Sequence, residues 1–180
     1  MVNRRIFGFG SLVTKGTHDY DWIGTCRLAG YRRVWVPSNT WDISFLSVEL
    51  DPISTIDGAV LEIRDKDWPS LLEREKGYDV HHLDSSRIDP QFNAVSLFVG
   101  RPDAIDPERA RPFLKSYLDT VITGFVDSFG VDRARGFFTS TAGWENGVKE
   151  DRSAPEYPRA VALRADIKTL VDEELEKLGI

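Results

Sequence analysis

Residues 6–13, Ile-Phe-Gly-Phe-Gly-Ser-Leu-Val, pass from an apolar strand pattern into a glycine-containing turn. Glycine takes left-handed backbone angles readily and lets a ligand approach the main chain closely. Consecutive N–H groups in such a turn form a concavity that suits an anion such as a carboxylate. Because Val13 stands three residues after Gly10, the segment lacks the G-x-G-x-x-G spacing of a dinucleotide site. A tight turn between two strands is the plainer interpretation of the same residues.

The chain around this segment predicts a strand-rich first half. Runs rich in valine, isoleucine, phenylalanine and tryptophan alternate there with turn residues. The predicted strands are 3–9, 22–36, 43–50, 56–63, 78–85 and 93–100. We expect a turn between the third and fourth of these strands, where Asp51-Pro52 and Asp57-Gly58 stand on either side.

The second half of the chain has helical spacing instead. Apolar residues recur every three or four positions from Pro112, which predicts a helix over 112–129 that ends at Gly130. A second amphipathic helix is predicted over 165–178, and 136–160 is predicted to be an ordered loop with short strands. Strands followed by helices favour an α+β fold in one domain, 1–180, with a mixed, barrel-like sheet and helices packed around it.

The composition narrows the class of protein. The 180 residues are 41% hydrophobic and 29% charged, which is typical of a soluble globular domain. A net charge of −6 disfavours a general nucleic-acid binder, because an acidic surface repels phosphate. The single cysteine, Cys26, excludes an internal disulfide and is expected to pack as a small apolar side chain. No apolar run suits a signal peptide or a membrane span, so we expect a soluble, cytoplasmic protein without a membrane partner.

A short helix is predicted where the sequence reads Trp68-Pro-Ser-Leu-Leu-Glu-Arg-Glu-Lys-Gly77. Asp65 or Asp67 is expected to cap its start, Pro69 suits its first turn, and Gly77 suits a left-handed exit.

One carboxylate of this helix falls on its apolar face. At about 100° per residue, Leu71 and Leu72 share a stripe with Trp68, and Glu75 continues that stripe. The other charged residues of the segment are expected in solvent; they are Glu73, Arg74 and Lys76. A carboxylate in apolar surroundings has a raised pKa, which suits a general base near neutral pH. The alternative places Glu75 at the helix rim, paired with Arg74 or with a strand arginine.

Four short motifs then occur in a recognisable order. They are Phe9-Gly10-Ser11-Leu12, Gly30-Tyr31-Arg32-Arg33, Asp57-Gly58-Ala59-Val60, and Leu71-Leu72-Glu73-Arg74-Glu75 with Gly77-Tyr78 after it. Together they resemble the gamma-glutamylcyclotransferase family over roughly residues 5–80, especially its glutathione-degrading branch. The predicted helix 112–129 fits the layout of that family. The chain departs from the family at Phe9, where a tyrosine is common, and the missing hydroxyl bears on substrate fit.

The resemblance implies a cofactor-independent and metal-independent enzyme acting on a small molecule. The backbone of Phe9, Gly10, Ser11 and Leu12 would bind the amino and carboxylate end of a gamma-glutamyl group. Glu75 would take a proton from the alpha-ammonium group, and the freed amine would attack the gamma-amide carbonyl. Glu75 would then protonate the leaving nitrogen. Glutathione, a gamma-glutamyl amino acid or a gamma-glutamylamine would thus give 5-oxoproline and a free amine.

A competing hypothesis is a non-catalytic small-molecule-binding or interaction protein on the same fold. A Glu75 side chain in solvent, or locked to an arginine, would favour that hypothesis over the enzyme.

Other residues keep two interpretations each. Arg32-Arg33 either attracts an anionic substrate or is a pair of solvated strand charges. Within 151–159, Arg152 and Tyr157 either cover the substrate pocket or belong to a loop braced by an Asp–Arg pair. His81-His82 is not expected to bind a metal ion, because adjacent strand residues face opposite sides of a sheet.

Overall fold

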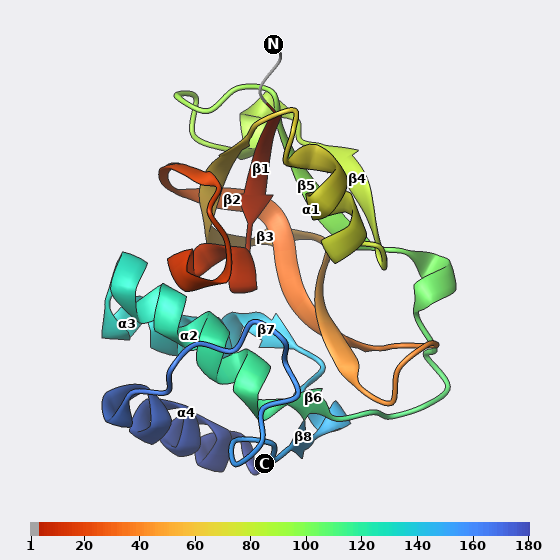
Figure 1. Cartoon of the computed structure of the whole chain (residues 1–180), viewed down its shortest axis with the longest axis vertical. Helices are drawn as coiled ribbons and strands as arrows, with labels where there is room; N and C mark the ends of the chain where they lie inside the picture. The colour runs from red at the N-terminus through yellow and green to blue at the C-terminus, as the bar shows by residue number, and fades with distance from the viewer. Residues whose placement is uncertain (1–3) are drawn as a thin grey trace.

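In the computed structural model, which describes residues 4–180, a six-stranded sheet packs against helices (Figure 1). Its order is β4-β5-β1-β3-β2-β7, and the pairs β1/β5 and β2/β7 are parallel while the others are antiparallel. The strands of this sheet are β1 (Arg4–Gly8), β2 (Asp21–Pro37), β3 (Ser44–Ile63), β4 (Tyr78–His82), β5 (Val95–Gly100) and β7 (Thr141–Ala142). The expected α+β class with a mixed sheet is confirmed. Because β4 and β7 form separate edges, the described sheet does not close into a barrel.

The predicted strands match the observed ones to within a few residues, with one exception in β3. Residue 3 of the predicted strand 3–9 lies outside the described residues. The predicted strands 43–50 and 56–63 both belong to β3, so the turn expected between them is wrong. Instead, the pairing of β2 with β3 shifts register beside Gly30, whose φ is +78°, and residues 51–54 bulge outward there. A bulge of this kind increases the local twist of a strand pair. Strands β2 and β3 pair again on both sides of it, so the chain does not turn back at residues 51–54.

The helices are α1 (Trp68–Arg74), α2 (Lys115–Phe129), α3 (Val131–Ser140) and α4 (Ala165–Leu178). The predicted bounds of α4 are confirmed. Helix α2 begins three residues later than expected, because Phe113–Leu114 forms the short strand β6 beside β8 (Val148–Lys149). Helix α3 was not predicted, and its last residues fall in the segment 136–160 that was expected to be a loop. Gly130 ends α2, but a new helix begins at the next residue. No helix among the described residues is long and apolar enough to cross a membrane.

The buried apolar side chains form two clusters, one on each side of the sheet. The larger cluster fills the space between the sheet and α2, α3 and α4, which lie together in the lower part of Figure 1. A smaller cluster, which includes Ile6 and Leu71, lies under α1 on the other side of the sheet. Cys26 is buried in the larger cluster, as expected. At Gly124 of α2, an added Cβ would lie 2.3 Å from the Thr14 hydroxyl, so α2 runs directly against the segment that follows β1.

Helix α1 is shorter than predicted. Asp67 is its N-cap residue but makes no capping hydrogen bond with its side chain, which accepts from Arg64 Nε at 2.7 Å instead. The helix ends at Arg74, with Glu75 as the C-cap residue, so Gly77 is not its left-handed exit. Leu71 is fully buried, whereas Leu72 is exposed, which narrows the predicted apolar stripe.

Candidate active site

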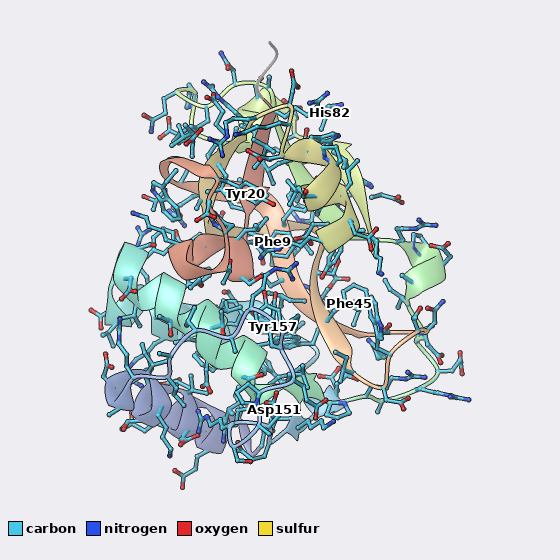
Figure 2. The ribbon with its side chains drawn as sticks, viewed as in Figure 1. Phe9, Tyr20, Phe45, His82, Asp151 and Tyr157 are labelled. Carbon is cyan, nitrogen blue, oxygen red and sulfur yellow. The ribbon has the colours of Figure 1, made fainter. Side chains whose placement is uncertain are left out.

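A cavity of about 360 Å³ opens where the glycine loop, the end of α1 and the start of α2 meet. It is lined by Ser11, Trp41, Ile43, Ser44, Phe45, Arg74, Glu75, Gly77, Tyr78, Leu114, Tyr117, Glu156, Tyr157, Pro158 and Arg159. A recess of about 30 Å³ adjoins it on the side of residues 7–12. Figure 2 shows Phe9, Phe45 and Tyr157 gathered in this central region, with His82 and Asp151 near opposite ends of the molecule.

Glu75 lines both the cavity and the recess. Its backbone N–H donates to the Leu71 carbonyl at 2.9 Å, which fixes the carboxylate at the last turn of α1. The side chain is only 14% exposed. Burial raises the pKa of Glu75 above its ordinary value of 4.5, while the positive charges of Arg74 and Arg159 oppose that rise. The carboxylate is therefore both accessible to a ligand and a stronger proton acceptor than a solvated glutamate.

Arg74 was expected in solvent, and this expectation is wrong. Its side chain is 6% exposed, and its Nε lies 3.1 Å from Glu75 Oε1. The same guanidinium donates to the Thr17 carbonyl at 3.0 Å and to Ser11 Oγ at 3.1 Å. Arg74 therefore ties α1 to the glycine loop. An inward Glu75 and a Glu75 paired with Arg74 were expected as alternatives. In the structure Glu75 pairs with Arg74 and also lines the cavity.

The glycine loop continues from β1 into a short 3₁₀ turn over Ser11–Val13, in which the Val13 N–H donates to the Gly10 carbonyl at 2.9 Å. Neither Gly8 nor Gly10 has a positive φ, so left-handed angles are not the reason for these glycines. Close packing is the reason, because a Cβ at Gly10 would lie 2.7 Å from the Tyr117 hydroxyl. The loop thus leaves its main chain accessible at the recess.

Phe9 and Leu12 also line the recess, although both side chains are largely buried among apolar neighbours. Ser11 lines the recess and the cavity alike, and it is one of four residues that do so, with Glu75, Tyr78 and Tyr117. The predicted loop and the predicted carboxylate, about sixty residues apart in sequence, therefore meet at one place.

Two buried tyrosines complete this junction. The Tyr117 hydroxyl is hydrogen-bonded with Ser11, and burial raises the pKa of Tyr117 well above its ordinary value. The Tyr78 hydroxyl donates to the Leu46 carbonyl at 2.8 Å, and burial likewise raises the pKa of Tyr78. Both hydroxyls stay protonated over the ordinary pH range. Tyr117 lies in the predicted helix 112–129, and the apolar periodicity of that segment does not distinguish it as a site residue. Its hydroxyl on an apolar helix face is the sequence signal that could have done so.

Arg33, considered as a substrate contact, does not line the cavity. Its side chain is buried beneath the loop, where Nε donates to the Phe9 carbonyl at 2.8 Å. The guanidinium carbon lies 4.8 Å from the ring centre of Phe125 and 4.9 Å from that of Phe137. Burial lowers the pKa of Arg33 to about 9. Arg33 therefore supports the loop from inside the core, and the solvated alternative is wrong for it. Arg32 is exposed as that alternative predicted, and its Nε lies 2.5 Å from Glu49 Oε1.

Arg152 lies outside the cavity as well. It forms a two-bond pair with Asp119, both bonds being 2.7 Å long, and a further bond of 2.6 Å with Asp172. Asp151 accepts from the Ser116 N–H at 2.8 Å at the start of α2. An Asp–Arg pair thus braces this segment, with Asp119 as the main partner. Tyr157 lines the cavity, and its backbone N–H donates to Ser116 Oγ at 3.4 Å.

The histidines do not gather into a metal site. His82 Nδ1 lies 2.9 Å from Ser96 Oγ, and His81 is exposed. Among residues 4–180 there is no group of three or more side chains of the kinds that hold a metal ion.

The fold of the described residues is similar to that of a solved gamma-glutamyl cyclotransferase structure. A solved structure named gamma-glutamyl cyclotransferase aligns with a TM-score of 0.59 at 12% identity, over 96% of this chain and 99% of that one. The human uncharacterised protein loc79017 aligns with a TM-score of 0.60 at 13% identity, over 94% and 98% of the two chains. YkqA from Bacillus subtilis aligns with a TM-score of 0.58 at 18% identity, over 79% of this chain and 57% of its own.

No protein-family model and no curated protein sequence matches the chain. At identities of 12 to 18%, the structural similarities establish a shared fold.

Proposed function

We propose that the chain cyclises a gamma-glutamyl group to 5-oxoproline and releases the attached amine. The observation that carries this proposal is the meeting of a buried carboxylate, Glu75, with an accessible glycine loop at the junction of a cavity and a recess. The volume of about 360 Å³ suits a small molecule. The fold shared with a gamma-glutamyl cyclotransferase supports the same reaction.

The reaction needs only acid–base chemistry and positioning. Glu75 accepts a proton from the alpha-ammonium group of the substrate, and the nitrogen lone pair attacks the gamma-carbonyl carbon. A new C–N bond closes the five-membered ring while the original amide C–N bond breaks. Glu75 then transfers its proton to the departing nitrogen, takes up the remaining extra proton of the ring nitrogen, and passes it to the departing amine, which leaves as an ammonium ion. Because attack is intramolecular, holding the substrate in its folded conformation supplies much of the rate enhancement.

The loop supplies the binding half of the site. Main-chain N–H groups of Phe9 to Leu12 bind the alpha-carboxylate or the oxygen on which negative charge develops. Tyr117 holds Ser11 in place, and Arg33 holds the Phe9 carbonyl. Arg74 stabilises the ionised form of Glu75 before the reaction begins, which keeps the base ready at neutral pH.

The proposal is tested by incubating the purified chain with glutathione, gamma-glutamyl dipeptides and gamma-glutamylamines, and by quantifying 5-oxoproline. We expect 5-oxoproline from at least one compound, with the amine released in equal amount. Failure of the entire panel at millimolar concentrations would contradict the proposed activity.

A second candidate is a small-molecule-binding protein that does not turn its ligand over. The ion pair between Arg74 and Glu75 favours it, since a carboxylate held by an arginine is a weaker base than an unpaired one. Under this hypothesis the panel compounds bind, as seen by calorimetry, without producing 5-oxoproline. Under the enzyme hypothesis Glu75→Gln binds the substrate but loses turnover.

A further inference from the structure

Two positive and two negative side chains line the cavity, and they differ in whether they are paired. They are Arg74, Glu75, Glu156 and Arg159. Arg74 pairs with Glu75 at 3.1 Å. Glu156 pairs with Lys149, whose Nζ lies 2.6 Å from Glu156 Oε1. Within residues 4–180, Arg159 alone among these four makes no ion pair. The cavity therefore presents one guanidinium that has no ion-pair partner among residues 4–180 and is available to a ligand.

Arg159 stands at a defined part of the cavity. It lines the wide part but not the recess beside the glycine loop. The positive charge of Arg159 also affects the interior of the cavity, because it opposes the rise in the pKa of the Glu75 carboxyl group. On its other side Arg159 borders a shallow depression with Asp19 and Asp67, and neither lies within ion-pair distance of it. Asp67 is already bound by Arg64 at 2.7 Å.

The walls beside Arg159 are apolar and aromatic. Phe45 lines the cavity and packs edge-on against Tyr78, with ring centres 5.2 Å apart. Tyr157 packs edge-on against Tyr117 at 4.9 Å. Trp41 is 44% exposed and lies over Gly77 at the same opening. Such surfaces bind an apolar or aromatic side chain rather than a hydrated one.

We propose that Arg159 is a specificity-determining residue, whose guanidinium binds a carboxylate on the amine half of the substrate while the aromatic wall takes an apolar side chain beside it. This inference rests on the proposed function, which places the glutamyl half at the recess and the amine half in the wide part. An amino acid with an apolar side chain fits this arrangement better than a simple amine does. Guanidinium–carboxylate bonds are strong and directional, so one arginine is sufficient to discriminate the two.

The test compares two substrates that differ only in that carboxylate: gamma-glutamylphenylalanine and gamma-glutamylphenethylamide. Both keep the alpha-carboxylate of the glutamyl half. An arginine that recognised the alpha-carboxylate would therefore affect both substrates equally. We expect the native chain to prefer gamma-glutamylphenylalanine by about tenfold in kcat/KM, mainly through KM. In Arg159→Gln the ratio of the two kcat/KM values falls towards one. Arg109→Gln, which changes an exposed arginine outside the cavity, keeps the native ratio.

Gamma-glutamylglycine tests the aromatic wall. It keeps the same carboxylate without the side chain, so it is expected to bind more weakly than gamma-glutamylphenylalanine. Equal affinity for these two compounds would remove the aromatic wall from the proposal.

Calorimetric binding of the same compounds to Glu75→Gln separates this inference from the proposed function. If no compound yields 5-oxoproline but the tenfold binding preference is present and disappears on adding Arg159→Gln, the activity is wrong and the carboxylate site stands. If 5-oxoproline forms while the substrate ratio is near one, or survives Arg159→Gln, the role of Arg159 is overturned. Absence of both binding and turnover overturns it as well.

Discussion

Replacing Arg74 by methionine tests how the site is held together. The native guanidinium contacts Thr17, Ser11 and Glu75 from a side chain that is only 6% exposed. Methionine keeps much of the apolar stem but removes every donor. The change therefore disconnects α1 from the glycine loop while leaving both segments in place.

The expected loss of stability follows from these contacts. The bonds to the Thr17 carbonyl and to Ser11 Oγ contribute about 1 kcal/mol each. Loss of the partner of a largely buried carboxylate adds about 1 kcal/mol, less than for a fixed charge, because Glu75 can take up a proton. We expect the free energy of unfolding at pH 7 to fall by about 3 kcal/mol, and Tm by roughly 9 °C.

Urea denaturation at pH 5 and at pH 7 measures this change and its cause. Without Arg74, the folded-state pKa of Glu75 rises further above its ordinary value. The folded variant then binds more protons than the unfolded chain, so its stability falls as pH rises, and its deficit is larger at pH 7 than at pH 5. Arg64→Met, which breaks a partly exposed ion pair with Asp67, is the matched control and should change Tm little. A deficit below about 1 kcal/mol at pH 7, or one independent of pH, would show that Arg74 does not hold α1 and Glu75 in this way.

Further predictions concern backbone packing, the buried carboxylate and the buried hydroxyl. Gly58→Ala should destabilise the chain by about 2 kcal/mol or more in urea denaturation, because the new Cβ would lie 2.4 Å from the Gly8 carbonyl oxygen. Gly136→Ala, which meets no atom within 4 Å, should instead be neutral or stabilise α3 by up to about 1 kcal/mol. The raised pKa of Glu75 contributes stability below its ordinary value of 4.5, and this is lost as pH rises through the folded-state pKa, so thermal melts should show Glu75→Gln gaining on the native chain from pH 4 to 8. Tyr117→Phe should lower kcat/KM for 5-oxoproline formation by about tenfold, and an unchanged value would exclude a role of its hydroxyl in placing the loop.

Local sequence patterns were sufficient for most elements of the fold. The bounds of α4 and the existence of five strands of the main sheet follow from hydrophobic periodicity. The turn in β3 was predicted wrongly because Asp51-Pro52 is strong turn chemistry. In the structure, Asp51-Pro52 lies in a bulge instead, because Gly30 of β2 has a positive φ at this point and the two strands pair again beyond it. Such a decision depends on a partner strand and not on the local residues.

In the candidate active site, too, local residues were enough to predict some features, while others depend on distant parts of the chain. The spacing of apolar residues in α1 was enough to predict that the side chain of Glu75, the C-cap residue of this helix, points inward. It could not place Arg74, because the contacts of that arginine lie about sixty residues earlier in the chain. Arg33 was misjudged because alternation along a strand does not reveal that the covering layer carries Phe125 and Phe137, whose rings accept a cation. Arg159 lies in a segment without periodicity, so only the folded chain brings it to the cavity.

The role of Glu75 is tested most directly by single-turnover formation of 5-oxoproline in Glu75→Gln and Glu73→Gln, with the best substrate of the panel. Glu73 lies two residues away, is exposed, and pairs with Lys76. If Glu75 moves the proton, Glu75→Gln loses at least about 100-fold in rate while its substrate affinity is retained. Glu73→Gln stays within about twofold of the native chain, as expected for a surface charge. Turnover in Glu75→Gln at the native rate would contradict the proposed proton transfer by Glu75.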